Sequence, residues 1–174
     1  MRVVFLGTNG WYDTETGNTV SMVIDAPDAV IILDAGYGLA KLDRYVSLDR
    51  PAFLFLSHLH LDHIVGLHVV SAFDFTRGLS ICGGDGFAST LNTILDAPFT
   101  VPARDFRFEA RFMELPRETG SLPFTVKALP LVHSVPTWGY RFDIDGKTIA
   151  YVGDTGFCEN AVELAKDAVL LIAE

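Results

Sequence analysis

The sequence predicts one domain of the α/β or α+β class, in which helices cover mixed β-sheets. Runs rich in β-branched and other apolar residues outnumber the segments with helical spacing, and the two kinds follow one another in mixed order. The chain has 174 residues, which is enough for a single domain with a substantial core. It shows no internal repeat and no low-complexity linker, so we expect no boundary between domains.

The N-terminal half alternates expected strands with expected helices. The strands at 19–25 and 29–35 are separated by a short turn with Pro27, which favours an antiparallel hairpin. The run PAFLFLS at 51–57 is apolar without interruption, as in a strand that is buried on both faces. The expected strands are 2–7, 19–25, 29–35, 51–57 and 79–84, and the expected helices are 37–46, 63–75 and 85–96.

The C-terminal half is expected to contain mainly strands. Residues 105–115 alternate between polar and apolar side chains, as an exposed edge strand does. Asp145-Gly146 is a strong signal for a two-residue hairpin turn. The expected strands are 105–115, 123–133, 138–144, 147–154 and 168–174, and the expected helix is 160–167.

Composition and charge argue against several classes of protein. With 49% hydrophobic and 20% charged residues, the chain is typical of a globular protein. No apolar run reaches the roughly 18–20 residues that span a membrane, and the N-terminus lacks the features of a signal peptide, so we expect a cytoplasmic protein that does not use a membrane. Cys82 and Cys158 are expected to be inert thiols in a reducing compartment. The net charge of −9 argues against a broad nucleic-acid-binding surface.

Three of the five histidines lie close together in the stretch FLFLSHLHLDHIVGL at 53–67. A buried strand ends here, and ligand sites in layered α/β proteins lie at strand ends. His58 and His60 lie on one side of an extended segment, and Asp62 and His63 follow as the chain turns. Imidazole and carboxylate groups suit zinc and similar ions, so the cluster predicts a metal site. The alternatives are a solvated loop that contains histidines by chance and a structural single-metal site, although structural sites usually use cysteines.

The H-x-H-x-D-H pattern resembles that of the metallo-β-lactamase-fold hydrolases, and further segments match this family in order. Asp34 in ILDAG resembles the family's early Asp-x-Gly element, and His133 stands where the next ligand is expected. Asp154 in YVGDT resembles the family's bridging aspartate, and LIAE at 171–174 resembles the strand that follows. The resemblance spans the whole chain and implies a four-layer αββα sandwich.

The resemblance extends to one branch of this family. The stretch HSVPTWGY at 133–140 is similar to the H-x-x-P-x-x-G-Y stretch of the ribonuclease Z and phosphodiesterase group. In ribonuclease Z a tRNA-binding arm lies between this stretch and the aspartate strand, whereas residues 141–150 here contain only the predicted hairpin. Together with the negative charge, this departure argues against tRNA and favours a small-molecule or short phosphodiester or ester as the substrate.

The resemblance also implies roles for individual residues. Enzymes of this family attack their substrate with a hydroxide bridged between two divalent ions, here expected to be zinc, with manganese or iron as alternatives. Asp62 would also orient this hydroxide or accept its proton. Asp34 would hold a ligand histidine in the required tautomer, and Ser134 would contact the substrate. The implied ligands are His58, His60 and His133 for the first ion, Asp62 and His63 for the second, and Asp154 for both.

One departure from the family concerns the C-terminus. The family completes its second metal site with a late histidine, but no histidine follows His133, and the sequence stops within the apolar run AVLLIAE. We therefore expect residues 1–174 to be a C-terminally truncated single domain whose second half is incomplete. His68, on the predicted helix 63–75, is expected to point away from the site.

Two alternatives to a phosphodiesterase remain open from the sequence. The same metal core would allow hydrolysis of a carboxylic ester, a thioester or a lactone. A non-catalytic metal-binding module is expected if the protein is complete at 174 residues, because the second ion would then be weakly held. The resemblance is also compatible with a homodimer, although the sequence reveals no interface.

Overall fold

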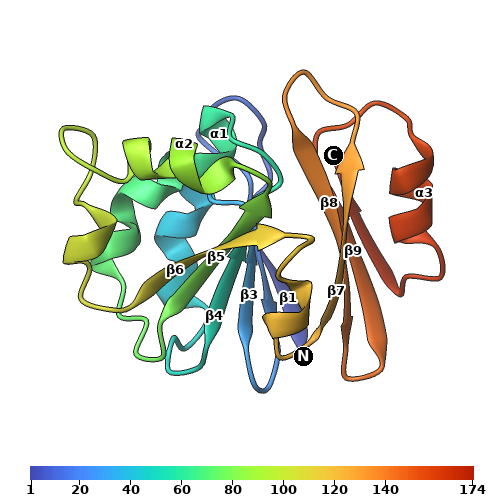
Figure 1. Ribbon diagram of the computed structural model, residues 1–174, viewed down its shortest axis with the longest axis horizontal. Helices are drawn as coiled ribbons and strands as arrows, with labels where there is room; N and C mark the ends of the chain where they lie inside the picture. Colours follow the sequence, from blue (N-terminus) through green and yellow to red (C-terminus); the bar gives the residue numbers. More distant parts are fainter.

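The computed structural model describes all residues, 1–174, and contains two β-sheets with helices on their outer sides. Figure 1 shows the order of the layers: α1 (Leu61–Ile64) and α2 (Phe87–Ile94) lie on the side of the larger sheet, and α3 (Glu159–Ala165) covers the smaller one. Separate hydrophobic clusters fill the spaces between successive layers. The predicted four-layer αββα sandwich is therefore confirmed.

The larger sheet combines an antiparallel part with a parallel part. Its strands, in spatial order, are β1 (Arg2–Gly7), β2 (Ser21–Asp25), β3 (Val30–Leu33), β4 (Ala52–Phe55), β5 (Leu79–Gly84) and β6 (Ala110–Leu115). β1 to β3 pair in antiparallel fashion, and β3 to β6 are parallel. The hairpin predicted around Pro27 is confirmed, because Asp25 pairs with Val30.

All strands of the smaller sheet come from the C-terminal part of the chain. Its strands, in spatial order, are β10 (Leu170–Ala173), β9 (Lys147–Val152), β8 (Thr137–Ile144) and β7 (Thr125–Leu131). β10 runs parallel to β9, and the other pairs are antiparallel. Asp145 and Gly146 have φ values of 50° and 70°, as the two central residues of a type I′ turn require. The predicted hairpin therefore joins β8 directly to β9.

β4 is buried on both faces, as its uninterrupted apolar run predicts. Phe53 and Phe55 point into the core between the two sheets, whereas Leu54 and Leu56 belong to the core beneath the helices. Successive side chains of a strand point to opposite faces, so one short strand contributes to both cores. The loop that follows β4 is therefore anchored by a strand that is packed into both hydrophobic cores.

The predicted helix at 63–75 is interrupted in the structure. It consists of α1 followed by the 3-10 helix η2 (Val65–Ala72). The α-helical pattern breaks because Ala35 lies against this segment: its N–H donates to the carbonyl oxygen of His63 at 2.7 Å, and its carbonyl oxygen accepts from the N–H of Gly66 at 2.8 Å. The same contact brings the neighbouring Asp34 next to His63.

The other helical segments follow the sequence more closely. α2 and α3 confirm the helices predicted at 85–96 and 160–167, and residues 37–46 form a 3-10 helix, η1 (Tyr37–Arg44), in place of an α-helix. No helix in the structure combines the length and the apolar character that a membrane span requires.

The predicted edge strand at 105–115 is shorter than its alternating pattern suggests. β6 lies at the edge of the larger sheet but begins only at Ala110. The residues before it form the 3-10 helix η3 (Ala103–Asp105), and Phe106 and Phe108 then pack against the core beneath the helices. Burial of these two rings takes precedence over strand pairing. A last 3-10 helix, η4 (Thr119–Ser121), precedes β7.

Candidate metal centre

The predicted histidines and aspartates meet where strand ends of the two sheets face each other. His58 and His60 lie in the loop after β4, and His63 lies in α1. His133 follows β7, and Asp154 follows β9. Residues that are up to 96 positions apart in the sequence are thus brought to one rim of the molecule, between the two sheets.

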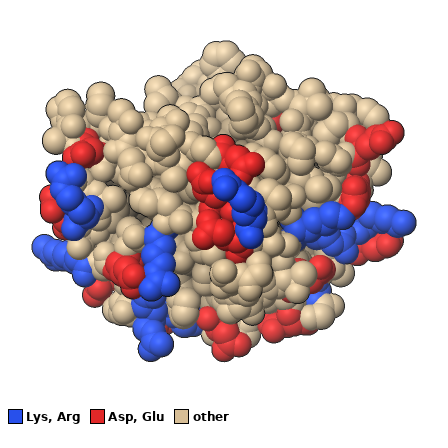
Figure 2. All heavy atoms as spheres, in the orientation of Figure 1, with Lys and Arg blue, Asp and Glu red and all other residues tan.

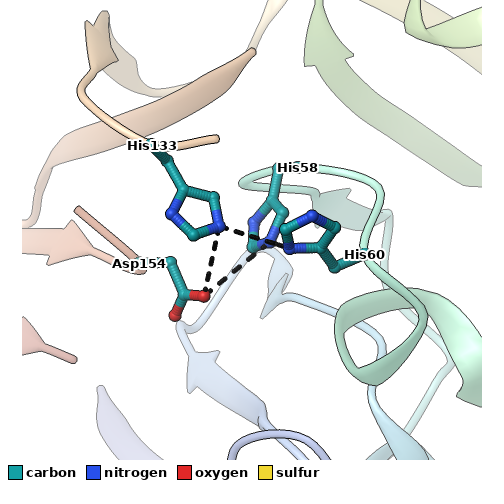
Figure 3. Close-up of side chains that lie close together, drawn as sticks. All are labelled: His58, His60, His133 and Asp154. Carbon is teal, nitrogen blue, oxygen red and sulfur yellow. Dashed lines mark hydrogen bonds and ion pairs between the residues drawn. The ribbon is translucent and has the colours of Figure 1, made fainter. Parts of the chain in front are cut away.

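One group of side chains contains three imidazoles and a carboxylate. Nε2 of His58 lies 2.9 Å from Nδ1 of His60, which in turn lies 3.2 Å from Nε2 of His133. Oδ2 of Asp154 lies 3.5 Å from His133 Nε2 and 4.0 Å from His58 Nε2. Figure 3 shows the three rings and the carboxylate turned toward one another. These four atoms all lie within 4.8 Å of one another, as atoms that share one metal ion would.

A second group lies on the other side of the same aspartate. Oδ1 of Asp154 lies 3.8 Å from Nε2 of His63, and Oδ2 of Asp62 lies 3.9 Å from the same nitrogen. Glu174, which follows β10, brings a carboxylate oxygen within 4.8 Å of His63 and Asp154. The two oxygens of Asp154 therefore face two different groups of side chains.

Asp34 fixes the orientation of His63. It is completely buried and has a φ of 53°, a left-handed conformation that aspartate tolerates better than most residues. Its Oδ2 accepts hydrogen bonds from Nδ1 of His63 at 2.8 Å and from the hydroxyl of Tyr151, while the backbone N–H of Ser57 donates to Oδ1 at 2.6 Å. Since Nδ1 of His63 donates its proton to Asp34, it is Nε2 that faces Asp154, and an ion bound there would take the place of a proton on Nε2.

Ser57 has the same effect on His58. Its hydroxyl donates to Asp34 Oδ2 at 2.7 Å, which leaves the oxygen lone pairs free to accept from Nδ1 of His58 at 3.0 Å. Nε2 of His58 is then bare and faces the first group. This role of Ser57 could not be predicted from the sequence, where the residue only marks the end of an apolar strand.

The chemistry of these groups fits a divalent cation. Nε2 of His63 is buried and has no hydrogen-bond partner in the protein. Because buried polar atoms are nearly always paired, this nitrogen indicates a bound group that the side chains do not supply. Burial and the neighbouring His63 lower the pKa of His58 to about 4, so its imidazole is neutral and able to bind a metal. Burial opposes the charge on His63, but the hydrogen bond and charge of Asp34 and the charges of Asp62 and Asp154 raise its pKa to about 9. The second group therefore attracts positive charge.

Asp62 is held from outside the centre by the loop after β1. The backbone N–H of Trp11, which has a φ of 63°, donates to Asp62 Oδ2 at 2.7 Å. Burial raises the pKa of Asp62, but this hydrogen bond and the nearby His63 lower it below its usual value overall. Asp62 is therefore ionised and oriented at the edge of the second group.

Two further residues singled out in the sequence belong to neither group of side chains. His68 is exposed, its ring stacks on Tyr37 at a centroid distance of 5.8 Å, and its Nδ1 lies 2.6 Å from the carbonyl oxygen of Val65. This agrees with its predicted position on a helix surface. Ser134 is exposed beside His133 and lines none of the main cavities. Its contact with a substrate stays a prediction.

Glu174 is a member of the cluster that sequence reasoning missed. Its N–H donates to the carbonyl oxygen of Val152, which places it beside the end of β9 and near Asp154. Burial and the charge of Asp154 raise its pKa above the usual value. The signal in the sequence was only positional: an acidic residue follows an apolar strand, and the parallel pairing of β10 with β9 decides that both strands end at the same rim.

Comparison with known proteins gives the same picture for the fold and the family. Residues 29–174 match the family model of the beta-lactamase superfamily domain. The ribonuclease Z of Nanoarchaeum equitans is 28% identical over 147 residues, which cover 80% of this chain and 45% of that protein. The ribonuclease Z of Staphylococcus carnosus is 26% identical over 235 positions, which cover all of this chain and 76% of that protein. The chain thus spans about half the length of the first relative.

Three solved structures share the arrangement of strands and helices. The metallo-β-lactamase fold protein YhfI from Bacillus subtilis superposes with a TM-score of 0.76 at 21% identity, over 97% of this chain and 68% of its own. The short form of human tRNase Z also gives 0.76, at 23% identity, over 97% and 75%. A diphosphatase of the PhnP family gives 0.70 at 15% identity, over 97% and 72%. At such identities the likeness shows the fold alone.

Proposed function

Because the chain belongs to the beta-lactamase superfamily, we propose that it is a metal-dependent hydrolase that cleaves phosphodiesters with two divalent ions, most simply zinc. The observation that carries the proposal is the position of Asp154. Its Oδ2 faces His133 and its Oδ1 faces His63, which is the arrangement needed by a carboxylate that bridges two ions. When bound, such a pair of ions activates water for attack and stabilises the negative charge that develops on the substrate.

The side chains divide into two ligand sets in this proposal. His58, His60 and His133 would hold the first ion, and Asp62 and His63 would hold the second. Asp154 would contact both ions, and the carboxylate of Glu174 stands close enough to complete the second set. Manganese or iron would suit the same nitrogen and oxygen atoms, so the donors alone do not select zinc.

Asp62 is the residue that we assign to orienting a water molecule. The Trp11 N–H holds its Oδ2 in place, and its lowered pKa keeps the carboxylate ionised, so that it can accept a hydrogen bond from a water molecule and orient it. The buried pair of Asp34 and His63 performs a different task, because both side chains are fully buried and away from solvent. In this pair, Asp34 keeps the imidazole ring of His63 in a fixed orientation during the reaction.

The names of the relatives support a phosphodiester over a carboxylic ester. The two curated relatives described above are both named ribonuclease Z. This name denotes hydrolysis at phosphorus. The short turn that joins β8 directly to β9 leaves no room there for a tRNA-binding arm and favours a small diester over tRNA. The alignment with the Staphylococcus carnosus protein is 235 positions long, whereas this chain has 174 residues, so that relative contains segments that this chain lacks.

Hydrolysis of bis(4-nitrophenyl) phosphate and of 4-nitrophenyl acetate tests the proposal. We expect metal-dependent turnover of the phosphodiester that EDTA removes, a loss of at least 100-fold in kcat/KM for His133→Ala, and no change for the control His68→Ala. Preferential cleavage of the acetate would favour the ester alternative. Bound metal without hydrolysis of either compound would favour the non-catalytic module.

A further inference from the structure

A cavity opens beside the first group of histidines. Its volume is 220 Å³, below the roughly 300–1,000 Å³ of pockets that enclose a complete drug-sized ligand. The space therefore suits one substituent of a larger substrate. His58 and His60 form one wall, and the loop from the end of β5 to the start of α2 forms another. Val135, Pro136 and Trp138, which lie just after His133 in the sequence, contribute the apolar surface.

Glycines at the end of β5 allow aromatic rings to line this cavity. A Cβ added to Gly84 would lie 1.7 Å from Nε1 of Trp138, and one added to Gly83 would lie 2.6 Å from Cδ2 of Phe87. Both rings thus rest directly on the backbone, where any side chain would displace them. The backbone N–H of Trp138 also donates to the carbonyl oxygen of Ser57 at 2.9 Å, which fixes the start of β8 beside the residue that precedes His58. The wall is therefore part of the folded framework.

The charges around the cavity do not suit a second phosphate. No lysine or arginine lines it, and its one carboxylate, Asp85, forms an ion pair with Arg117 at 2.9 Å. Arg117 also pairs with Glu114, so its charge is already balanced by carboxylates. In Figure 2 the lysine and arginine side chains lie over the middle and lower parts of the molecule and are absent from the upper rim in this view. A polyanion would find no row of cations here.

We propose that this cavity binds an uncharged flat ring of the substrate, a nucleobase, against Trp138, while the adjoining phosphodiester lies at the metal centre. The proposal rests on the proposed function and narrows its substrate class to esters of a nucleoside that carry a single phosphate. Stacking on an aromatic side chain contributes about 1–3 kcal/mol per base. The ring would therefore distinguish such substrates from simple alkyl phosphodiesters.

Fluorescence of Trp138 tests the cavity without requiring turnover. The chain has two tryptophans, so Trp11→Phe leaves Trp138 as the only indole. Titration of this variant with thymidine is expected to change the fluorescence in a saturable way, whereas deoxyribose, which lacks the base, is expected to change nothing. An equal response to both compounds, or no response to thymidine, would overturn the proposal.

Turnover then tests whether the ring contributes to specificity. The two substrates are the 4-nitrophenyl ester of thymidine 5′-monophosphate and methyl 4-nitrophenyl phosphate, which share a leaving group. We expect the ratio of their kcat/KM values to favour the nucleoside ester by about tenfold, to fall toward one in Trp138→Leu, and to stay unchanged in the control Phe99→Ala, whose ring is 67% exposed and outside the cavity. A ratio near one in the unaltered protein would overturn the proposal.

The two experiments separate failure of the cavity from failure of the chemistry. If thymidine binds but neither phosphodiester is cleaved, the cavity assignment stands and the proposed hydrolase activity falls. If both phosphodiesters are cleaved equally and thymidine does not bind, the activity stands and the cavity assignment falls. The leucine substitution keeps the site filled with an apolar side chain, and the thymidine titration uses no variant of Trp138, so a misfolded mutant would not decide the outcome.

Discussion

The two sides of the metal centre are built differently, although both lie at strand ends. On the side of the larger sheet, the side chains of His58 and His63 are fully buried, and Ser57 and Asp34 lie within hydrogen-bonding distance behind their rings. On the side of the smaller sheet, the side chain of His133 is 23% exposed and that of Asp154 is 27% exposed.

This difference suggests that one side of the site contributes to folding stability as well as metal binding, and the other side to metal binding alone. The larger sheet supplies imidazoles on a rigid base, where a lost contact leaves a buried polar group without a partner. The smaller sheet supplies an imidazole and a carboxylate that are partly exposed to solvent. Changes on the first side should therefore reduce folding stability and metal binding together, whereas changes on the second side should reduce metal binding and leave the metal-free fold intact.

The largest expected contrast is between Asp34→Asn and Asp154→Asn. Both oxygens of Asp34 accept hydrogen bonds, so an amide at this position would present its NH₂ group to a donor in either orientation, and breaking a buried charged pair costs about 3–5 kcal/mol. Asp154→Asn should change stability by less than about 1 kcal/mol, because its carboxylate is partly exposed. Urea unfolding in EDTA measures both free energies, and equal losses would contradict the distinction between the two sides.

A smaller contrast concerns two buried tyrosines. Tyr151 donates to the charged Asp34, and Tyr140 donates to the carbonyl oxygen of Leu56 at 2.6 Å. Tyr151→Phe should therefore lower the free energy of unfolding by about 1.5–3 kcal/mol and Tyr140→Phe by about 0.5–1.5 kcal/mol. The same urea titrations give both values. A larger loss for Tyr140→Phe would show that Asp34 is not the centre of the rigid side.

Substitutions of two glycines are expected to differ in their cost to the free energy of unfolding by a similar or smaller amount. A Cβ at Gly66 would lie 2.3 Å from the carbonyl oxygen of Gly36, where α1 and η2 meet the Asp34 loop, whereas a Cβ at Gly153 would lie 3.2 Å from the hydroxyl of Tyr151. Gly66→Ala should cost about 1–3 kcal/mol, because backbone has to move, and Gly153→Ala should cost less than about 1 kcal/mol. Thermal unfolding of both variants would detect the order, and the reverse order would be inconsistent with a close Asp34 loop.

Much of the fold, and the dense histidine stretch of the candidate site, could be predicted because their signals are local. The apolar run of β4, the Asp145-Gly146 turn and the dense histidine stretch each occupy a few consecutive residues. The interruption of α1 could not be predicted, because it depends on hydrogen bonds from Ala35, some thirty residues earlier.

Other parts of the centre depend on contacts between the sheets. The hydroxyl of Tyr151 reaches Asp34 across 117 positions of sequence, and Glu174 reaches Asp154 only because β10 pairs in parallel with β9. No local pattern marks either residue. The resemblance to a family supplied the position of His133, which stands alone in the sequence.

The central claim is that the two sides together hold two ions around Asp154. Elemental analysis after reconstitution with excess zinc and desalting tests it most directly, with Asp154→Asn measured in parallel. The account predicts close to two zinc ions per chain for the unaltered protein and one or fewer for the variant. One or fewer zinc ions in the unaltered protein, or two in both proteins, would contradict it.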